Sequence, residues 1–114
     1  MDCARFARHV RLSNKVEFGK VFEQHTKSGD IYFTVLVRPN ELGFSRLGLA
    51  ISRKSARTAV ARNRIKRVIR ESFRHHQQQL GSRDFVVIGR ENLAGYSNAI
   101  FFDSLERHWL RLTE

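Results

Sequence analysis

Hydrophobic residues recur along this chain at two spacings, one typical of helices and the other of strands. Helical spacing predicts three helices, over residues 14–25, 56–77 and 98–112. Strand patterns lie between them, at residues 31–38, 46–52 and 84–90. This order of elements predicts an α+β fold: a two-layer sandwich of three helices on a small mixed sheet, within one domain over residues 1–114.

The first and last predicted helices each carry one apolar stripe. Asn14 can cap the first helix, and its stripe consists of Phe18, Val21, Phe22 and His25. Ser97 is expected to cap the last helix, and its stripe consists of Phe101, Leu105, His108, Trp109 and Leu112. Stripes of this kind usually pack into a core, so the sequence leaves open whether Phe18 and Phe22 are core or surface.

The strand patterns differ in the faces that they bury. Residues 31–38 alternate, with Ile31, Phe33, Val35 and Val37 on one face and Tyr32, Thr34, Leu36 and Arg38 on the other. Residues 46–52 place Leu47, Leu49 and Ile51 on one side and small residues on the other, where a backbone or ligand can approach closely. The apolar run in residues 85–88 is typical of a strand buried on both faces.

The middle helix separates into an apolar side and a cationic side. At 100° per residue, six side chains fall on the side expected to pack on the sheet: Ala61, Ile65, Val68, Ile69, Ser72 and Phe73. The opposite side is expected to face solvent and consists of Asn63, Lys66, Arg67, Arg70 and Arg74. Arg62 and Arg64 fall at the two margins between these sides.

Charge is concentrated in this part of the chain. Residues 53–74 contain nine Lys or Arg and one acid, Glu71, a net charge of +8 against +10 for all 114 residues. Cations one turn apart, such as Arg70 and Arg74, repel each other by a few tenths of a kcal/mol. A cationic face of one sign therefore favours a polyanion, and nucleic acid is the usual one. Asn63 between two arginines adds a donor and an acceptor, which suits folded RNA.

Composition limits the alternatives. The chain is 41% hydrophobic, which is enough for one modest core, and a single Cys3 fits a reducing cytoplasm. No apolar run is long enough to cross a membrane, and the first twelve residues lack the apolar centre of a secretory signal. Residues 1–11 are basic and are expected to form either a flexible arm that contacts RNA or a frayed terminus.

The distribution of acids and histidines gives no protein active site. The eleven acids are dispersed, and adjacent His75 and His76 would point about 100° apart on a helix, which makes a poor acid–base or ligand pair. We therefore expect no catalytic residue and no metal ligand in the protein. A DNA-binding regulator is also disfavoured, because no helix-turn-helix or dimer seam is visible.

The basic helix and its surroundings resemble those of the bacterial ribonuclease P protein family. The run from Ala59 to Arg74 (AVARNRIKRVIRESFR) is similar to the family's most specific segment. The resemblance extends upstream through residues 47–54 (LGLAISRK) and the first helix, and downstream through residues 84–88 (DFVVI) and the last helix. The loop at residues 53–56 and the turn at residues 38–44 depart from the expected forms. A ribosomal-type structural RNA-binding protein is the alternative.

The resemblance implies a fold and an activity. The family's sheet has four strands, so a short extra strand is expected within residues 26–45. A left-handed βαβ crossover is also implied, against the usual hand. The implied function is that of the protein subunit of ribonuclease P, an endonuclease whose catalytic RNA removes the 5′ leader of precursor tRNA. The RNA subunit, with bound magnesium, would carry out hydrolysis.

The resemblance also assigns residues to two contacts. The catalytic RNA would be bound by Arg62, Asn63, Arg64, Lys66, Arg67 and Arg70. The leader would lie in a cleft formed by Phe18, Phe22, Phe33, Arg53 and Lys54, where aromatic rings can stack on any base. The expected partners are the catalytic RNA, with one protein per RNA, and precursor tRNA. No membrane partner is expected, and the expected location is the cytoplasm.

Overall fold

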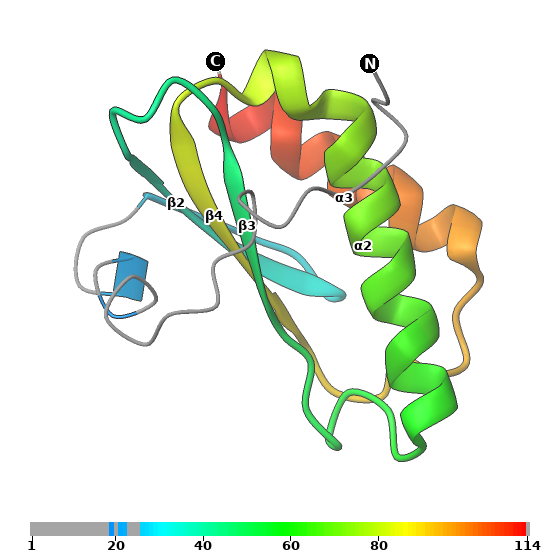
Figure 1. Ribbon diagram of the computed structural model, residues 1–114. Helices are drawn as coiled ribbons and strands as arrows, with labels where there is room; N and C mark the ends of the chain where they lie inside the picture. The colour runs from blue at the N-terminus through cyan, green and yellow to red at the C-terminus, as the bar shows by residue number, and fades with distance from the viewer. Residues whose placement is uncertain (1–18, 20, 23–25, 114) are drawn as a thin grey trace.

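The structure is a computed structural model that describes residue 19, residues 21–22 and residues 26–113. Its elements are β1 (Thr26–Gly29), β2 (Phe33–Pro39), β3 (Arg46–Ala50), α2 (Ala59–Leu80), β4 (Arg83–Gly89) and α3 (Asn98–Leu112). Helices α2 and α3 lie together on one side of the sheet (Figure 1). Gly19, Val21 and Phe22 are helical, in agreement with the first predicted helix. The rest of that helix and the basic arm lie outside the described residues.

The four strands form one mixed sheet in the order β1-β2-β4-β3. The β1–β2 and β2–β4 pairs are antiparallel, and β3 runs parallel to β4. The α+β class is therefore confirmed, and β1 is the extra strand expected within residues 26–45. Helix α2 connects the adjacent parallel strands β3 and β4, which is the βαβ unit that the resemblance implies. The left-handed sense of this unit stays a prediction.

Two predicted boundaries are wrong for local reasons. A strand was predicted to begin at Ile31, but Ile31 lies before β2 and is 68% exposed. Asp30 explains this, because its Oδ1 accepts hydrogen bonds from the backbone N–H groups of Tyr32 (2.8 Å) and Phe33 (2.9 Å) and closes a turn there. Helix α2 begins at Ala59 and not at residue 56, since Thr58 is its N-cap and accepts from the Ala61 N–H.

The main core lies between the sheet and the two helices. The apolar side predicted for α2 is confirmed, since Ile65, Val68, Ile69 and Phe73 are all at most 3% exposed. Ser72 on the same side accepts a hydrogen bond of 2.9 Å from Trp109 Nε1, which joins α2 to α3. The hydroxyl thus satisfies the indole N–H inside the core. The opposite sheet face carries a smaller cluster of Val21, Leu36 and Val86, with Ile88 packed against it.

Candidate RNA-binding surface

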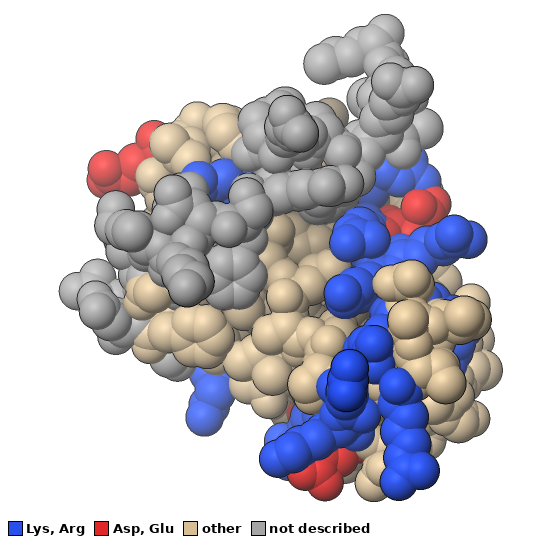
Figure 2. Space-filling model, turned by 60° about the horizontal axis from the view of Figure 1, so that its bottom comes forward, with Lys and Arg blue, Asp and Glu red and all other residues tan. Residues whose placement is uncertain are grey.

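The outward face of α2 presents side chains that are open to solvent. Asn63 and Arg67 are exposed, and Lys66 and Arg70 are half-buried. Figure 2 shows Lys and Arg side chains gathered along one side of the molecule, with few acids among them. Because the apolar side of α2 is fixed in the core, these cations are held on a rigid support. A polyanion bound there would not have to order a flexible segment.

Glu71, the one acid of α2, pairs with Arg74, the last cation on the outward side of the helix. Its carboxylate accepts a hydrogen bond from Arg74 and lies 3.4 Å from His75 Nε2. The hydrogen bond from Arg74 is the main cause that holds the pKa of Glu71 below its usual range, against the opposing effect of burial. Glu71 is therefore ionised and is paired with Arg74, one turn beyond the Lys66–Arg70 region.

Arg62 and Arg64 point to backbone and side-chain partners within the protein. Arg62 Nη1 donates to the carbonyl oxygens of Ala56 (3.0 Å) and Arg57 (2.9 Å), which fixes the loop before α2. Arg64 reaches the loop before α3, where it donates to Asn98 Oδ1 (2.5 Å) and Ala94 O (3.1 Å). Its guanidinium also lies 5.5 Å from the centre of the Phe101 ring. Both arginines therefore position neighbouring segments in addition to any contact with RNA.

The loop between β3 and α2 forms a pocket of about 1010 Å³ beside the N-terminus of α2. Arg53 and Lys54, predicted to bind leader phosphates, both line this pocket and are exposed. The pocket also contains Arg57, which the sequence analysis missed although it belongs to the same basic run. Its three cations and the N-terminus of α2 outweigh the one acid of the lining, Glu91, and favour an anion there.

The loop is held against the end of β4. Asn92 N–H donates to Lys54 O (3.0 Å) and Leu93 N–H donates to Ser55 O (2.7 Å). Gly89 allows this approach, because a Cβ at that position would come within 2.8 Å of Ser55 Oγ and 2.9 Å of the Ile51 side chain. The positions of Arg53 and Lys54 thus depend on a glycine that is far away in the sequence.

The predicted aromatic cleft requires a correction. Phe33 has no exposed surface and packs on Phe101 in the main core, with ring centres 5.4 Å apart. Leu36 lies on the opposite sheet face, beneath Val21, because odd and even residues of a strand point to opposite sides. Phe33 therefore cannot line a surface beside Phe22, which is 47% exposed. The other predicted ring, Phe18, lies outside the described residues.

The sheet residues nearest to this first helix are Leu36, Val86 and Ile88. The sequence carried a signal for Leu36, since it is the apolar residue on the outer face of the alternating segment 31–38. The signal was weak because the neighbouring outward positions, Thr34 and Arg38, are polar.

The described residues, 26–113 and the few before them, contain no group of three or more His, Cys, Asp or Glu side chains placed to hold a metal ion. In the same part of the chain, neither helix has the length and apolar character needed to cross a membrane.

A small α+β domain with a rigid cationic helix face belongs to the class of nucleic-acid-binding domains.

Comparisons with known proteins define the family more closely. The model of the ribonuclease P family matches residues 6–113. The ribonuclease P protein component of Methylococcus capsulatus is 53% identical over 108 residues, covering 95% of this chain and 84% of that protein. The Vibrio cholerae protein of the same name is 43% identical and covers 99% of this chain and 96% of its own length.

Solved structures show the same fold. The RNase P protein of Staphylococcus aureus superimposes with a TM-score of 0.82 at 30% identity, covering 92% of this chain and 95% of the other. The RNase P protein of Thermotoga maritima gives 0.78 at 31% identity, covering 89% and 96%. The chain belongs to the ribonuclease P protein family.

Proposed function

We propose that this chain, as the protein subunit of a tRNA-processing ribonuclease P, binds the catalytic RNA through α2 and the 5′ leader of precursor tRNA through a separate surface. The catalytic RNA, with magnesium bound to it, hydrolyses the phosphodiester bond. The protein contributes binding and orientation. One protein binds each RNA, and the complex acts in the cytoplasm.

The observation that carries this proposal is the fixed cationic face of α2. Asn63, Lys66 and Arg67 project from a helix whose other side is fully buried. Arg70 lies one turn beyond Lys66, and Arg62 and Arg64 hold the two adjoining loops. The face therefore combines phosphate-binding cations with one amide that can read a base or a ribose hydroxyl.

The leader surface is proposed on the other side of the sheet and at its β3 end. Phe22 is nearly half exposed and can stack on an unpaired base, together with Phe18. Arg53 and Lys54, with Arg57, provide phosphate contacts in the pocket before α2. This surface excludes Phe33, and the buried Leu36 supports it from the sheet beneath Val21, with Ile88 packed beside them.

Reconstitution tests the proposal directly. The purified protein is mixed with a bacterial ribonuclease P RNA and a leader-bearing precursor tRNA at low magnesium. We expect cleavage at the mature 5′ end that requires both the protein and the RNA. Leader removal by the protein alone would contradict the assignment. Unchanged RNA-only activity would instead favour a structural RNA-binding protein of another assembly.

Arg67→Ala tests the catalytic-RNA face. Because Arg67 is exposed, we expect unchanged folding, several-fold weaker binding of the catalytic RNA, and a salt slope reduced by about one. Arg38→Ala removes the same charge from β2 and is the matched control. Fluorescence anisotropy over a salt series measures the affinity of both variants for the catalytic RNA. Equal losses of affinity would mean that only net charge matters.

Phe22→Ala tests the leader surface. Loss of one stacking ring is expected to reduce the preference of the holoenzyme for precursor over mature tRNA by about five-fold or more. Leu110→Ala, at another exposed apolar position, should leave that preference unchanged. The ratio of the two dissociation constants is the measurement. A large fall in melting temperature without a change in the ratio would assign Phe22 to the core.

A further inference from the structure

A second group of cations lies away from the basic helix, in a pocket of about 740 Å³ between the β1–β2 hairpin and α3. Its cations come from three elements or their ends: Lys27, Arg90, Arg107 and Arg111. None of them belongs to the basic segment 53–74. Ile31 and Tyr32 add apolar surface to the same pocket.

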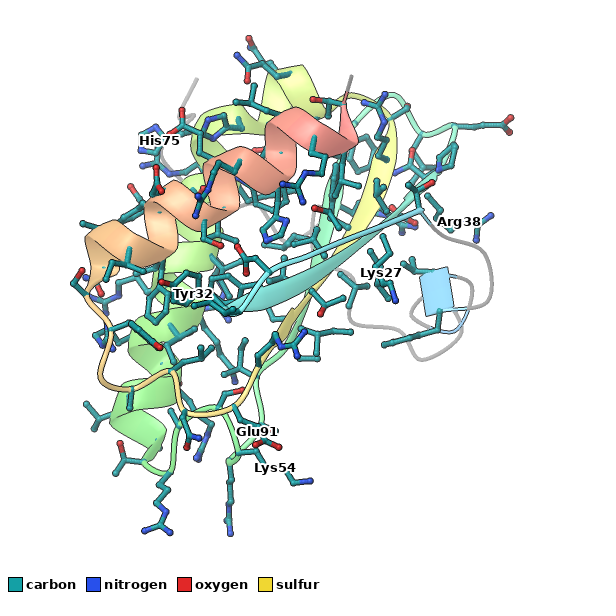
Figure 3. The ribbon with its side chains drawn as sticks, turned by 180° about the vertical axis from the view of Figure 1, so that it is seen from behind. Lys27, Tyr32, Arg38, Lys54, His75 and Glu91 are labelled. Atoms are coloured by element: carbon teal, nitrogen blue, oxygen red, sulfur yellow. The ribbon has the colours of Figure 1, made fainter. Side chains whose placement is uncertain are left out.

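This pocket is separate from the two surfaces proposed above. Strand β1 is one edge of the sheet, and β3, which leads into the basic loop, is the other edge. Figure 3 views the molecule from the side of α3, with Lys27 and Tyr32 along the β1–β2 hairpin. Lys54, from the pocket before α2, lies at a different end of the molecule in this view. Phosphates bound in this pocket would therefore be different from those bound by α2 or by the loop before it.

A polar network holds the two walls of the pocket together. Arg111 Nη1 donates to Ser28 Oγ (3.1 Å), and Ser28 Oγ lies 2.7 Å from His108 Nδ1. His108 Nε2 is 3.1 Å from Asp30 Oδ2, which also accepts a hydrogen bond of 2.5 Å from Ser104. Because Ser28 and His108 are almost fully buried, these contacts fix α3 against the hairpin and give the pocket a defined shape.

The charges that line the pocket favour an anion. Asp30 is the one acid among its described lining residues, and its carboxylate is used by Ser104, by His108 and by the backbone N–H groups of the turn. Lys27 and Arg90 make no side-chain hydrogen bond or ion pair within the described part of the chain. Arg107 pairs with Asp103 at 3.4 Å, but both side chains are more than half exposed, so this pair holds the arginine weakly.

We propose that this pocket is a further RNA-binding site that takes the phosphodiester backbone of a strand, with Tyr32 and Ile31 beside a base or sugar. Cations from several elements surround the exposed Ile31 and the partly buried Tyr32, whose ring packs edge-on against Tyr96, and such a mixture of cations and apolar groups suits an unpaired strand. An acidic peptide would use the cations but would leave the aromatic edge without a planar partner. The pocket proposal rests on the proposed function in one respect: it takes the bound RNA to be either the catalytic RNA or precursor tRNA.

The test compares two double variants with the same loss of charge. Lys27→Gln/Arg90→Gln removes two pocket cations whose side chains form no hydrogen bond or ion pair with the residues that the structure describes. Arg38→Gln/Arg83→Gln removes two cations from one end of the sheet, where β2 ends and β4 begins, and is the charge-matched control; Arg83 also donates to Leu80 O (2.7 Å), so folding of this variant is checked first. Circular dichroism and melting temperature first establish that both variants fold like the unmodified protein.

Two binding measurements follow for each variant over a salt series. One uses the protein with ribonuclease P RNA, and the other uses the assembled holoenzyme with precursor tRNA. We expect the pocket variant to lose about ten-fold in affinity in one of these measurements, with a salt slope reduced by roughly one to two, since two phosphate contacts are removed. The control should lose less than about two-fold. The measurement that shows the loss identifies the RNA.

Two results would overturn the proposal. Equal losses for the two double variants would reduce the effect to net charge. No loss with either RNA would leave the pocket to another ligand, such as an acidic protein. Either result is compatible with the proposed function if Arg67→Ala still weakens binding of the catalytic RNA. Failure of the unmodified protein to bind that RNA would reject the proposed function itself.

Discussion

Arginine side chains in α2 that look equivalent in the sequence have different contacts in the structure. Arg67 is exposed, whereas Arg64 donates to Asn98 Oδ1 and Ala94 O and lies over the Phe101 ring. A guanidinium that joins α2 to the start of α3 stabilises the folded state, and RNA contact is an additional use. Helical spacing places Arg64 at the margin of the helix but does not reveal a partner 34 residues away.

Arg64→Ala is therefore expected to lower stability. Loss of two hydrogen bonds and the ring contact at a half-buried site should cost about 1–2 kcal/mol. Asn63→Ala is the control, because an exposed position without such contacts should change stability by less than about 0.5 kcal/mol. Urea unfolding of the two variants measures this difference. Equal stability would mean that the Arg64 contacts add nothing to the fold.

His108 makes stability depend on pH. Burial lowers the pKa of His108 below its usual value, although the nearby Asp30 carboxylate acts in the other direction. Arg107 and Arg111, also close, lower it further. The unfolded chain therefore takes up a proton more readily than the folded one. The contribution of neutral His108 to the free energy of unfolding is fully present above about pH 6.5, the ordinary pKa of histidine. It is lost as the pH falls below that value.

The variant His108→Gln removes this titration. Between pH 7.5 and 5.5 the unmodified protein should lose stability with a contribution from His108 of at most about 1.4 kcal/mol per pH unit. His108→Gln should show a flatter profile over the same range, even if it is less stable at every pH. Urea unfolding at several pH values gives both profiles. Parallel profiles would assign the acid sensitivity to other groups.

At the scale of elements, periodicity predicted the type of nearly every segment but not its ends. The cationic and apolar sides of α2 follow from 3.6-residue geometry, so Ile65, Val68 and Phe73 are buried as expected. The start of β2 depends instead on Asp30, whose carboxylate closes a turn and leaves Ile31 outside the sheet. Single side chains that bond to nearby backbone override the hydrophobic pattern at element ends.

The site was predictable where it lies on one element and was not where it combines several. The α2 face belongs to one helix and was found from spacing. Phe33 was assigned to the leader cleft by resemblance, but the strand direction places it in the core against Phe101. The pocket with Lys27, Arg90 and Arg111 combines residues up to 84 positions apart. Such a combination depends on strand order, which composition and periodicity do not specify.

At the scale of the whole molecule, positive charge opposes folding. A net charge of +10 on 114 residues is concentrated on α2, the loop before it and the pocket beside α3. The chain has 21 Lys or Arg residues against eleven acids, and two of those acids, Glu71 and Asp30, are already paired. Like charges brought together on folding raise the free energy of the native state, and bound anions lower it.

Sulfate is therefore expected to stabilise the protein more than chloride does at the same ionic strength. Screening is equal in the two salts, and at low millimolar sulfate the general stabilisation by exclusion of sulfate from protein surfaces is small, so the difference there reports binding of a doubly charged anion to the folded cationic sites. Sulfate at 100 times its dissociation constant would add about 2.7 kcal/mol per site. Melting temperatures followed by circular dichroism in matched sulfate and chloride measure this.

The Lys27→Gln/Arg90→Gln variant should lose part of the sulfate effect, because one of the sites is weakened. Identical melting curves in the two salts would show that the cationic surfaces bind no anion specifically, and that charge acts only through long-range repulsion.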